Sequence, residues 1–299
     1  MEEWPSVSVV VPTRARSVLA RRAVSAILAQ QYEGELECVV VSDGAPPDGI
    51  AADPRVRLLD GGDANAAAAR NAGARAAAGE LLAFCDDDDV WLAEKLRVQV
   101  AALRASGALA ATCGIVVHYR GRPVPRLPGD DVATLADLVR SRLAHMHTST
   151  ILVGRDDFLG RIGPFDEQIP GSFGEDYEWL LRAAARGPIR TVRQPLVDVH
   201  WHGSSYFQSR WDLSVAAHRY LLEHHPELER DRIGAARIYG QLAFACAAGG
   251  RPRDALRWAR RCLRADWRQP RAYLALAVGS RILPPALLLD GLHRAGRGI

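Results

Sequence analysis

One stretch near residue 85 most constrains what this chain can fold into. Leu81–Phe84 is an apolar run of strand length, and four consecutive carboxylates, Asp86–Asp89, follow it after Cys85. A buried strand that ends in acids delivers them to the rim of a sheet, where open α/β folds bind their ligands. Adjacent like charges repel one another, and clustered carboxylate oxygens suit Mg²⁺ or Mn²⁺. A solvated turn is the other interpretation, but the apolar run before the acids and Trp91 after them disfavour it.

The segment before this stretch has the pattern of a strand, a helix and a second strand. Ser6–Pro12 is a β-branched run closed by a proline, Val18–Gln30 has apolar residues at helical spacing, and Leu36–Val41 is again strand-like. This order predicts a parallel pair with a right-handed crossover. Asp43 then lies at the carboxyl rim of the sheet, although a turn aspartate that bonds its own backbone explains this residue better when it is taken alone.

Two further helices carry polar residues that need an explanation. Asn65–Gly79 is alanine-rich and contains Arg70 and Asn71, which form either a surface pair or part of a site. Glu175–Ala184 begins with acids after a glycine-bearing segment, and these acids also complement the helix dipole. The remaining expected elements are strands at Arg55–Leu59, Ala110–Tyr119, Thr150–Val153 and Ile189–Val199, a helix at Leu92–Leu103 and a loop at Gly121–Asp131.

After Arg210 the pattern is helical only. At 299 residues we expect one large α/β domain, residues 1–210, and a smaller helical region, residues 211–299. Pro252 and Pro270 each open an apolar-periodic helix, and the pair resembles a single tetratricopeptide-type hairpin. The segment Ala286–Ile299 could touch a membrane surface or cap these helices, and contact between copies of the chain through them stays open.

Charge and cysteine usage exclude several classes of protein. The net charge is +3 and the basic residues are scattered, so we expect no nucleic-acid partner. The five cysteines are odd in number and widely spaced, which is typical of reduced core thiols in a cytoplasmic protein. The N-terminus has no apolar signal region, and no uninterrupted apolar run approaches the ~20 residues of a membrane helix.

Five motifs in this order resemble those of inverting family 2 glycosyltransferases with the GT-A fold, over roughly the first 205 residues. The motifs are Val9–Thr13, Val39–Gly44, Ala69–Gly73, Phe84–Trp91 with Lys95 and Leu96, and Gly174–Tyr177. The resemblance implies a Rossmann-like, mostly parallel mixed sheet flanked by helices, followed here by a small all-α region. It also implies a nucleotide-sugar donor, most often UDP-linked, and a divalent metal, Mn²⁺ or Mg²⁺.

The resemblance also implies roles for single residues. Asp176 matches the catalytic base, with Glu175 beside it, and Asp88 matches the metal-binding acid. His202 fits a later histidine near the diphosphate and metal better than His200 does. The donor-binding positions are Pro12, Thr13, Arg14, Asp43 for the base, Arg70 near the nucleotide, and Asp86 and Asp87.

The sequence departs from the family pattern at three places. Ser42 replaces an acid, and Thr13 and Arg14 stand where polar or aromatic residues are usual, which leaves base and sugar selectivity open. Four acids in place of three leave the metal ligand open between Asp88 and its neighbours.

Two other functions compete with sugar transfer. A nucleotidyltransferase would carry a glycine-rich, lysine-bearing phosphate loop near its N-terminus, and none is present. A non-catalytic nucleotide-sugar-binding or adaptor protein would not need the intact acids. The acceptor is open among saccharides, lipid-linked intermediates, peptides and small natural products.

Overall fold

The computed structural model describes residues 3–14, 16–44, 49–62, 64–119, 121–201, 210–285, 287–288 and 291. The chain forms two compact units. One comprises residues 1–135, 143–167 and 175–200, and the other comprises residues 136–142, 168–174 and 201–299. The domain boundary predicted after residue 210 stays a prediction.

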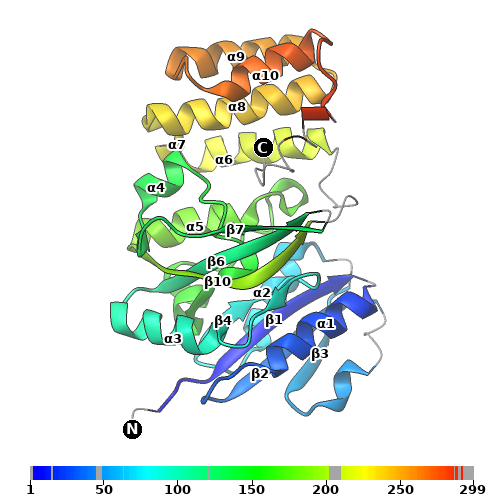
Figure 1. The fold of residues 1–299 in the computed structure, drawn as a ribbon, viewed down its shortest axis with the longest axis vertical. Coiled ribbons are helices and arrows are strands. Elements are labelled where there is room, and N and C mark those ends of the chain that lie inside the picture. Colours follow the sequence, from blue (N-terminus) through cyan, green and yellow to red (C-terminus); the bar gives the residue numbers. More distant parts are fainter. Residues whose placement is uncertain are drawn as a thin grey trace. The chain divides into compact units, whose positions relative to one another are not determined.

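The larger unit is built on four parallel strands in the order β3-β2-β1-β4 (Figure 1). They are β1 (Val7–Arg14), β2 (Leu36–Asp43), β3 (Val56–Asp60) and β4 (Leu81–Phe84). Helix α1 (Ser17–Leu28) connects β1 to β2, and α2 (Ala66–Ala76) connects β3 to β4. Because these strands are parallel, their carboxyl ends share one edge of the sheet.

The sheet continues past β4 in the order β9-β6-β10-β5. β9 runs antiparallel to β4, β6 antiparallel to β9, and β5 antiparallel to β10, so the sheet is mixed as expected. These strands are β9 (Leu152–Gly154), β6 (Ala110–Tyr119), β10 (Ile189–Trp201) and β5 (Val90–Trp91), with β8 (Val132–Ala133) against β10. Two further helices lie between these strands in the chain, α3 (Lys95–Ser106) and α5 (Glu175–Arg186). The sequence between strands also contains short turns at Ile50–Ala52, Thr148–Thr150, Asp157–Arg161 and Pro170–Ser172.

The loop expected at Gly121–Asp131 is wrong in part, because β7 (Arg122–Arg126) pairs with β6 there. Pro123 and Pro125 suggested a loop, since proline cannot donate to a sheet ladder. Among the described residues β7 pairs with β6 alone, so it tolerates prolines as an edge strand does.

The core of the sheet explains the valine-rich strands. Val9, Val10 and Val11 are fully buried, because helices cover both faces of a parallel sheet. Helix α2 approaches β1 so closely that a Cβ on Gly73 would lie 2.4 Å from Val10 Cγ1. Only glycine allows this approach, and it holds Arg70, one turn earlier on α2, near the carboxyl edge.

The other unit is helical. It contains α6 (Trp211–His224), α7 (Glu227–Arg230), α8 (Arg232–Ala248), α9 (Pro252–Ala265) and α10 (Pro270–Gly279), together with most of α4 (Leu135–Arg140). In α8, 14 of 17 residues are buried, so this helix is the core of the unit. The carboxylate of Asp231 caps α8 by accepting from Ile233 and Gly234 N–H. The tetratricopeptide-type arrangement stays a prediction.

No helix in the described part of the chain is both long enough and apolar enough to cross a membrane. All five cysteines are buried and free of disulfide bonds.

Lys95 is an unusual member of the core. Its side chain is fully buried at the start of α3, and its Nζ lies 3.7 Å from the centroid of the Trp91 ring. Nζ has no hydrogen-bond partner among the described residues. Burial lowers the pKa of this ammonium to about 8, because the charged form loses its hydration.

Lys95→Met should change how stability depends on pH. The pKa of Lys95 is lower in the folded chain than in the unfolded chain. Between pH 8 and pH 10.5 the unfolded chain therefore binds more protons, and the stability of the wild type rises with pH over this range. The free energy of unfolding of the variant minus that of the wild type should fall by up to about 3 kcal/mol from pH 7 to pH 10. Urea denaturation at several pH values measures this change, and a pH-independent difference would show that the pKa of Lys95 is the same in the folded and the unfolded chain.

Candidate active site

The acid loop, Asp86–Asp89, follows β4 at the carboxyl edge of the parallel strands, as the sequence predicts. Cys85 N–H donates to Val10 O at 3.0 Å, which extends the pairing of β4 with β1 by one residue. Asp89 N–H donates to Asp86 O at 3.1 Å and closes the loop as a turn. The four carboxylates therefore project from a backbone that the sheet fixes.

Ser149 holds the two ends of the acid loop together. Its Oγ accepts from Asp86 N–H at 3.0 Å and donates to Asp89 Oδ2 at 2.5 Å. Ser149 is completely buried in the short turn Thr148–Thr150. The loop geometry thus depends on a residue about 60 positions later in the chain.

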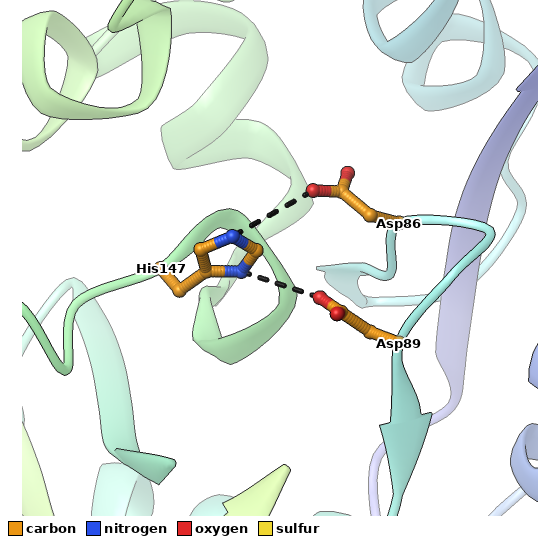
Figure 2. A group of neighbouring side chains, drawn as sticks. All are labelled: Asp86, Asp89 and His147. Carbon is orange, nitrogen blue, oxygen red and sulfur yellow. Dashed lines mark ion pairs between the residues drawn. The ribbon is translucent and has the colours of Figure 1, made fainter. Parts of the chain in front are cut away.

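His147 lies between two of these carboxylates (Figure 2). Its Nε2 is 3.9 Å from Asp86 Oδ2, and its Nδ1 is 3.3 Å from Asp89 Oδ2. One ligand atom from each of the three residues lies within 4.8 Å of the others. Two carboxylates and an imidazole are donors that Mn²⁺ accepts, and the other oxygen of Asp86 is already bonded to Arg70, so this donor set fits a divalent ion. A protonated imidazole that bridges both carboxylates would have to give up the hydrogen bond that Nδ1 accepts from Ser149 N–H at 3.3 Å.

The charges in this cluster follow from burial and neighbours. Burial opposes the charge of Asp86, but Arg70 and His147 outweigh it and lower the pKa of Asp86. Asp89 is buried among like charges, and this raises its pKa. A cation between Asp86 and Asp89 would therefore relieve a real electrostatic cost.

Asp87 and Asp88 have different partners. Thr13 Oγ1 donates to Asp87 Oδ2 at 2.8 Å, and Arg16 donates to Asp87 at 3.3 Å and to Asp88 at 3.1 Å. Burial raises the pKa of Asp87 to about 6. Asp88 lies outside the cluster of Asp86, Asp89 and His147. Its role as a metal ligand stays a prediction.

The ends of β1 and β2 meet beside the acid loop. Arg14 and Asp43 are register partners and form an ion pair. Pro12 lies beyond the last β1 residue that pairs with β4, so its missing N–H breaks no ladder bond on that side. The residues predicted to contact the donor from these strands are therefore neighbours in space.

Arg70 joins two acidic groups that are far apart in sequence. Its Nη2 donates to Asp86 Oδ1 and its Nη1 donates to Glu175 Oε1, both at 2.6 Å. The residue is 5% exposed, so the interpretation as a surface pair on α2 is wrong. Burial disfavours its charge, but Asp86, Glu175 and Asp176 outweigh this and raise the pKa of Arg70.

Asn71 is also buried, and it organises the segment that leads to α5. Its Nδ2 donates to Phe165 O at 2.8 Å and to Glu167 Oε1 at 2.9 Å, and its Oδ1 accepts from Phe165 N–H. Arg182 on α5 bonds the neighbouring carbonyls of Ile162, Gly163 and Pro164. Helices α2 and α5 are thus tied to the same loop.

Glu175 and Asp176 form the first turn of α5, and both are buried. Burial raises the pKa of Glu175, with Arg70 opposing the shift. Asp176 Oδ1 accepts from Tyr177 N–H at 2.7 Å, an N–H that the helix start leaves free. The guanidinium of Arg70 therefore lies between the acid loop and the first turn of α5, and it bonds one acid of each.

The outcomes differ for the two histidines considered from the sequence. His202 lies outside the described residues. His200 Nε2 lies 2.6 Å from Arg22 Nη2, and its ring stacks on His118 at 4.8 Å.

Sequence reasoning missed Arg16, His147 and Ser149. Arg16 stands just after the first predicted strand, and this position could have indicated that it belongs to the site. His147 and Ser149 carry no periodic or motif signal, because only the folded sheet brings them to the acids.

The carboxyl edge of the parallel half of the sheet thus carries an acid loop, a bridging arginine and a second acid pair. The model of the family "Glycosyl transferase family 2" matches residues 8–162, just over half of the chain. The chain therefore belongs to glycosyl transferase family 2.

Individual relatives agree with the family. The succinoglycan biosynthesis protein ExoO of Rhizobium meliloti is 32% identical over 207 residues, covering 62% of this chain and 58% of the relative. The chain thus spans less than two thirds of that protein.

Solved structures share the fold. S. aureus TarS 1–349 in complex with UDP-GlcNAc gives a TM-score of 0.66 at 16% identity, over 98% of this chain and 92% of TarS 1–349. The mannosyltransferase PcManGT of Pyrobaculum calidifontis, in complex with GDP-Man and Mn²⁺, gives 0.55 at 22% identity, over 96% and 79%.

Arg70→Met should destabilise the fold strongly, by about 3–5 kcal/mol, because it leaves buried carboxylates without their cation. Arg16→Met is the matched control on the same acid loop. Its side chain is 42% exposed, so its loss should cost below about 1 kcal/mol. Urea denaturation of both variants measures the difference, and equal losses would contradict the bridging role of Arg70.

Proposed function

We propose that this protein is a metal-dependent inverting glycosyltransferase that moves a sugar from a UDP-linked nucleotide-sugar to an acceptor hydroxyl. The observation that carries the proposal is the position of Arg70 between Asp86 on the acid loop and Glu175 at the start of α5. Arg70 thereby links Asp86, which would lie on the side of the nucleotide-sugar donor, to Glu175, which would lie on the side of the acceptor.

The donor side would consist of the strand ends. Asp43, beside Arg14, would contact the base, and Asp87, which accepts from Thr13, would contact the donor. The bound nucleotides named for TarS and PcManGT support a nucleotide-sugar donor, and the UDP-GlcNAc of TarS favours uridine.

A divalent metal, Mn²⁺ or Mg²⁺, would be held by Asp86, Asp89 and His147, with Asp88 and His202 as the ligands implied by the family pattern. When bound, such an ion supplies a Lewis acid that stabilises charge on diphosphate oxygens. Arg70 and Arg16 contribute fixed positive charge around the same acids.

The transfer needs a base on the acceptor side. In our proposal Asp176 takes the proton of the acceptor hydroxyl, whose oxygen attacks the anomeric carbon from the face opposite the diphosphate. The bond to the diphosphate oxygen breaks, and the anomeric centre inverts. Glu175, held by Arg70, would position the helix start rather than accept the proton.

Asp176→Asn should retain nucleotide-sugar binding and lose about 10²-fold or more in turnover, since the amide cannot accept the proton. Turnover is measured as UDP release from the UDP-sugar that most raises the melting temperature in a donor panel. Glu175→Gln, the matched control, should lose less. If only Glu175→Gln loses turnover, Glu175 rather than Asp176 is the base. If both variants turn over normally, the assignment of the base to this acid pair is refuted.

His147→Gln should weaken Mn²⁺ binding by at least about tenfold, because it removes one ligand. Titration of the full chain with Mn²⁺, followed by loss of the free-ion electron paramagnetic resonance signal, measures this directly. Asp88→Asn is the comparison variant and should change binding less. If only Asp88→Asn weakens Mn²⁺ binding, the ion is held as the family pattern implies, and His147 instead bridges Asp86 and Asp89 as an imidazolium.

A further inference from the structure

Helix α9 of the helical unit concentrates positive charge. Its 14 residues contain five arginines and one aspartate. The net charge of the whole chain is +3, so this one helix carries more positive charge than the entire sequence does in sum. The basic residues are therefore not evenly scattered over the fold.

Four of these arginines lie on one face of the helix. Arg253, Arg257, Arg260 and Arg264 are spaced by four, three and four residues, which places them in one row along an α-helix. All four are exposed, and we call them the arginine face. Ala255, Ala259 and Cys262 are the buried residues of α9. In Figure 1, α9 lies on the far side of α8 from α6, so it is an outer helix of its unit.

The arginine face has almost no anionic partner within its own unit. Among the described residues, Arg253, Arg260 and Arg264 form no ion pair, and Arg257 has only Asp254 at 3.9 Å. Arg261, just off this face, differs, because it binds Glu229 at 3.1 Å and lies 4.5 Å from the Tyr239 ring. Like charges at these spacings repel one another, so the row destabilises the isolated helix and is suited to an external anion.

Apolar side chains adjoin the arginine face. Leu256 lies one turn from Arg253 and Arg260 and is 40% exposed. Trp267, just after α9, is 65% exposed and lies beneath the guanidinium of Arg268 at 5.2 Å. Tyr273 donates to Trp267 O at 2.7 Å and fixes this turn while staying half exposed itself. An exposed tryptophan and tyrosine beside a cationic row are typical of a surface that enters a lipid headgroup layer.

We propose that the arginine face, with Leu256 and Trp267, binds the surface of an anionic lipid bilayer. The arginines supply charge complementarity to phosphate headgroups, and the exposed apolar side chains enter the interface between headgroups and acyl chains. A soluble polyanion such as nucleic acid would engage the arginines but leave Leu256 exposed to water. The combination of both kinds of side chain therefore favours the bilayer.

The test uses the full chain and sucrose-loaded vesicles, without donor or metal. Wild type should sediment with vesicles of phosphatidylglycerol and phosphatidylcholine, should not sediment with pure phosphatidylcholine, and should be released by salt. Each arginine contributes about fivefold to binding at an anionic surface. The triple variant Arg253→Gln, Arg260→Gln and Arg264→Gln should therefore bind about a hundredfold more weakly.

A control variant carries the same change of net charge elsewhere. Arg21→Gln, Arg75→Gln and Arg193→Gln alter three exposed arginines of the larger unit and should leave vesicle binding unchanged. Trp267→Ser with Leu256→Ser should weaken vesicle binding but not binding to heparin. The proposal is overturned if wild type ignores anionic vesicles, if both triple variants bind alike, or if the apolar substitutions have no effect and heparin binds as well as the vesicles do.

Discussion

The guanidinium of Arg70 is the interaction on which the site depends. It is buried and bonded to a carboxylate 16 residues later and to another 105 residues later. A buried cation is tolerated only when anions surround it, and buried anions need a cation in the same way. The ion pairs with Arg70 therefore fix the acid loop and the start of α5 relative to each other.

The rest of the acid loop follows the same rule. Four adjacent carboxylates would repel one another in isolation, and the fold gives each a separate partner. Side chains from three segments supply these contacts: Thr13 near the end of β1 and Arg16 just after it, Arg70 on α2, and His147 and Ser149 before β9. Preorganised groups of this kind are what a reaction that builds charge on phosphate oxygens requires.

The two units distribute charge differently. In the larger unit, arginines near the acid loop are paired with carboxylates. On α9, Arg253, Arg260 and Arg264 form no ion pair with any residue that the structure describes. Paired charge positions chemical groups within a site, whereas unpaired, exposed charge attracts an external anion. The same residue type therefore serves two purposes in one chain.

The sequence by itself determined the elements. β-branched runs, an Ala-rich helix and proline-opened helices have local causes, so the parallel strands, the crossovers and the acids at the carboxyl edge were predictable. The order of five motifs indicated the family. What only the tertiary structure decided is which polar residues meet. The burial of Arg70 and Asn71 and the positions of His147 and Ser149 beside the acids arise from contacts between residues about 60 to 105 positions apart. No local pattern encodes such contacts, because they are set by sheet register and by the close approach of α2 at Gly73.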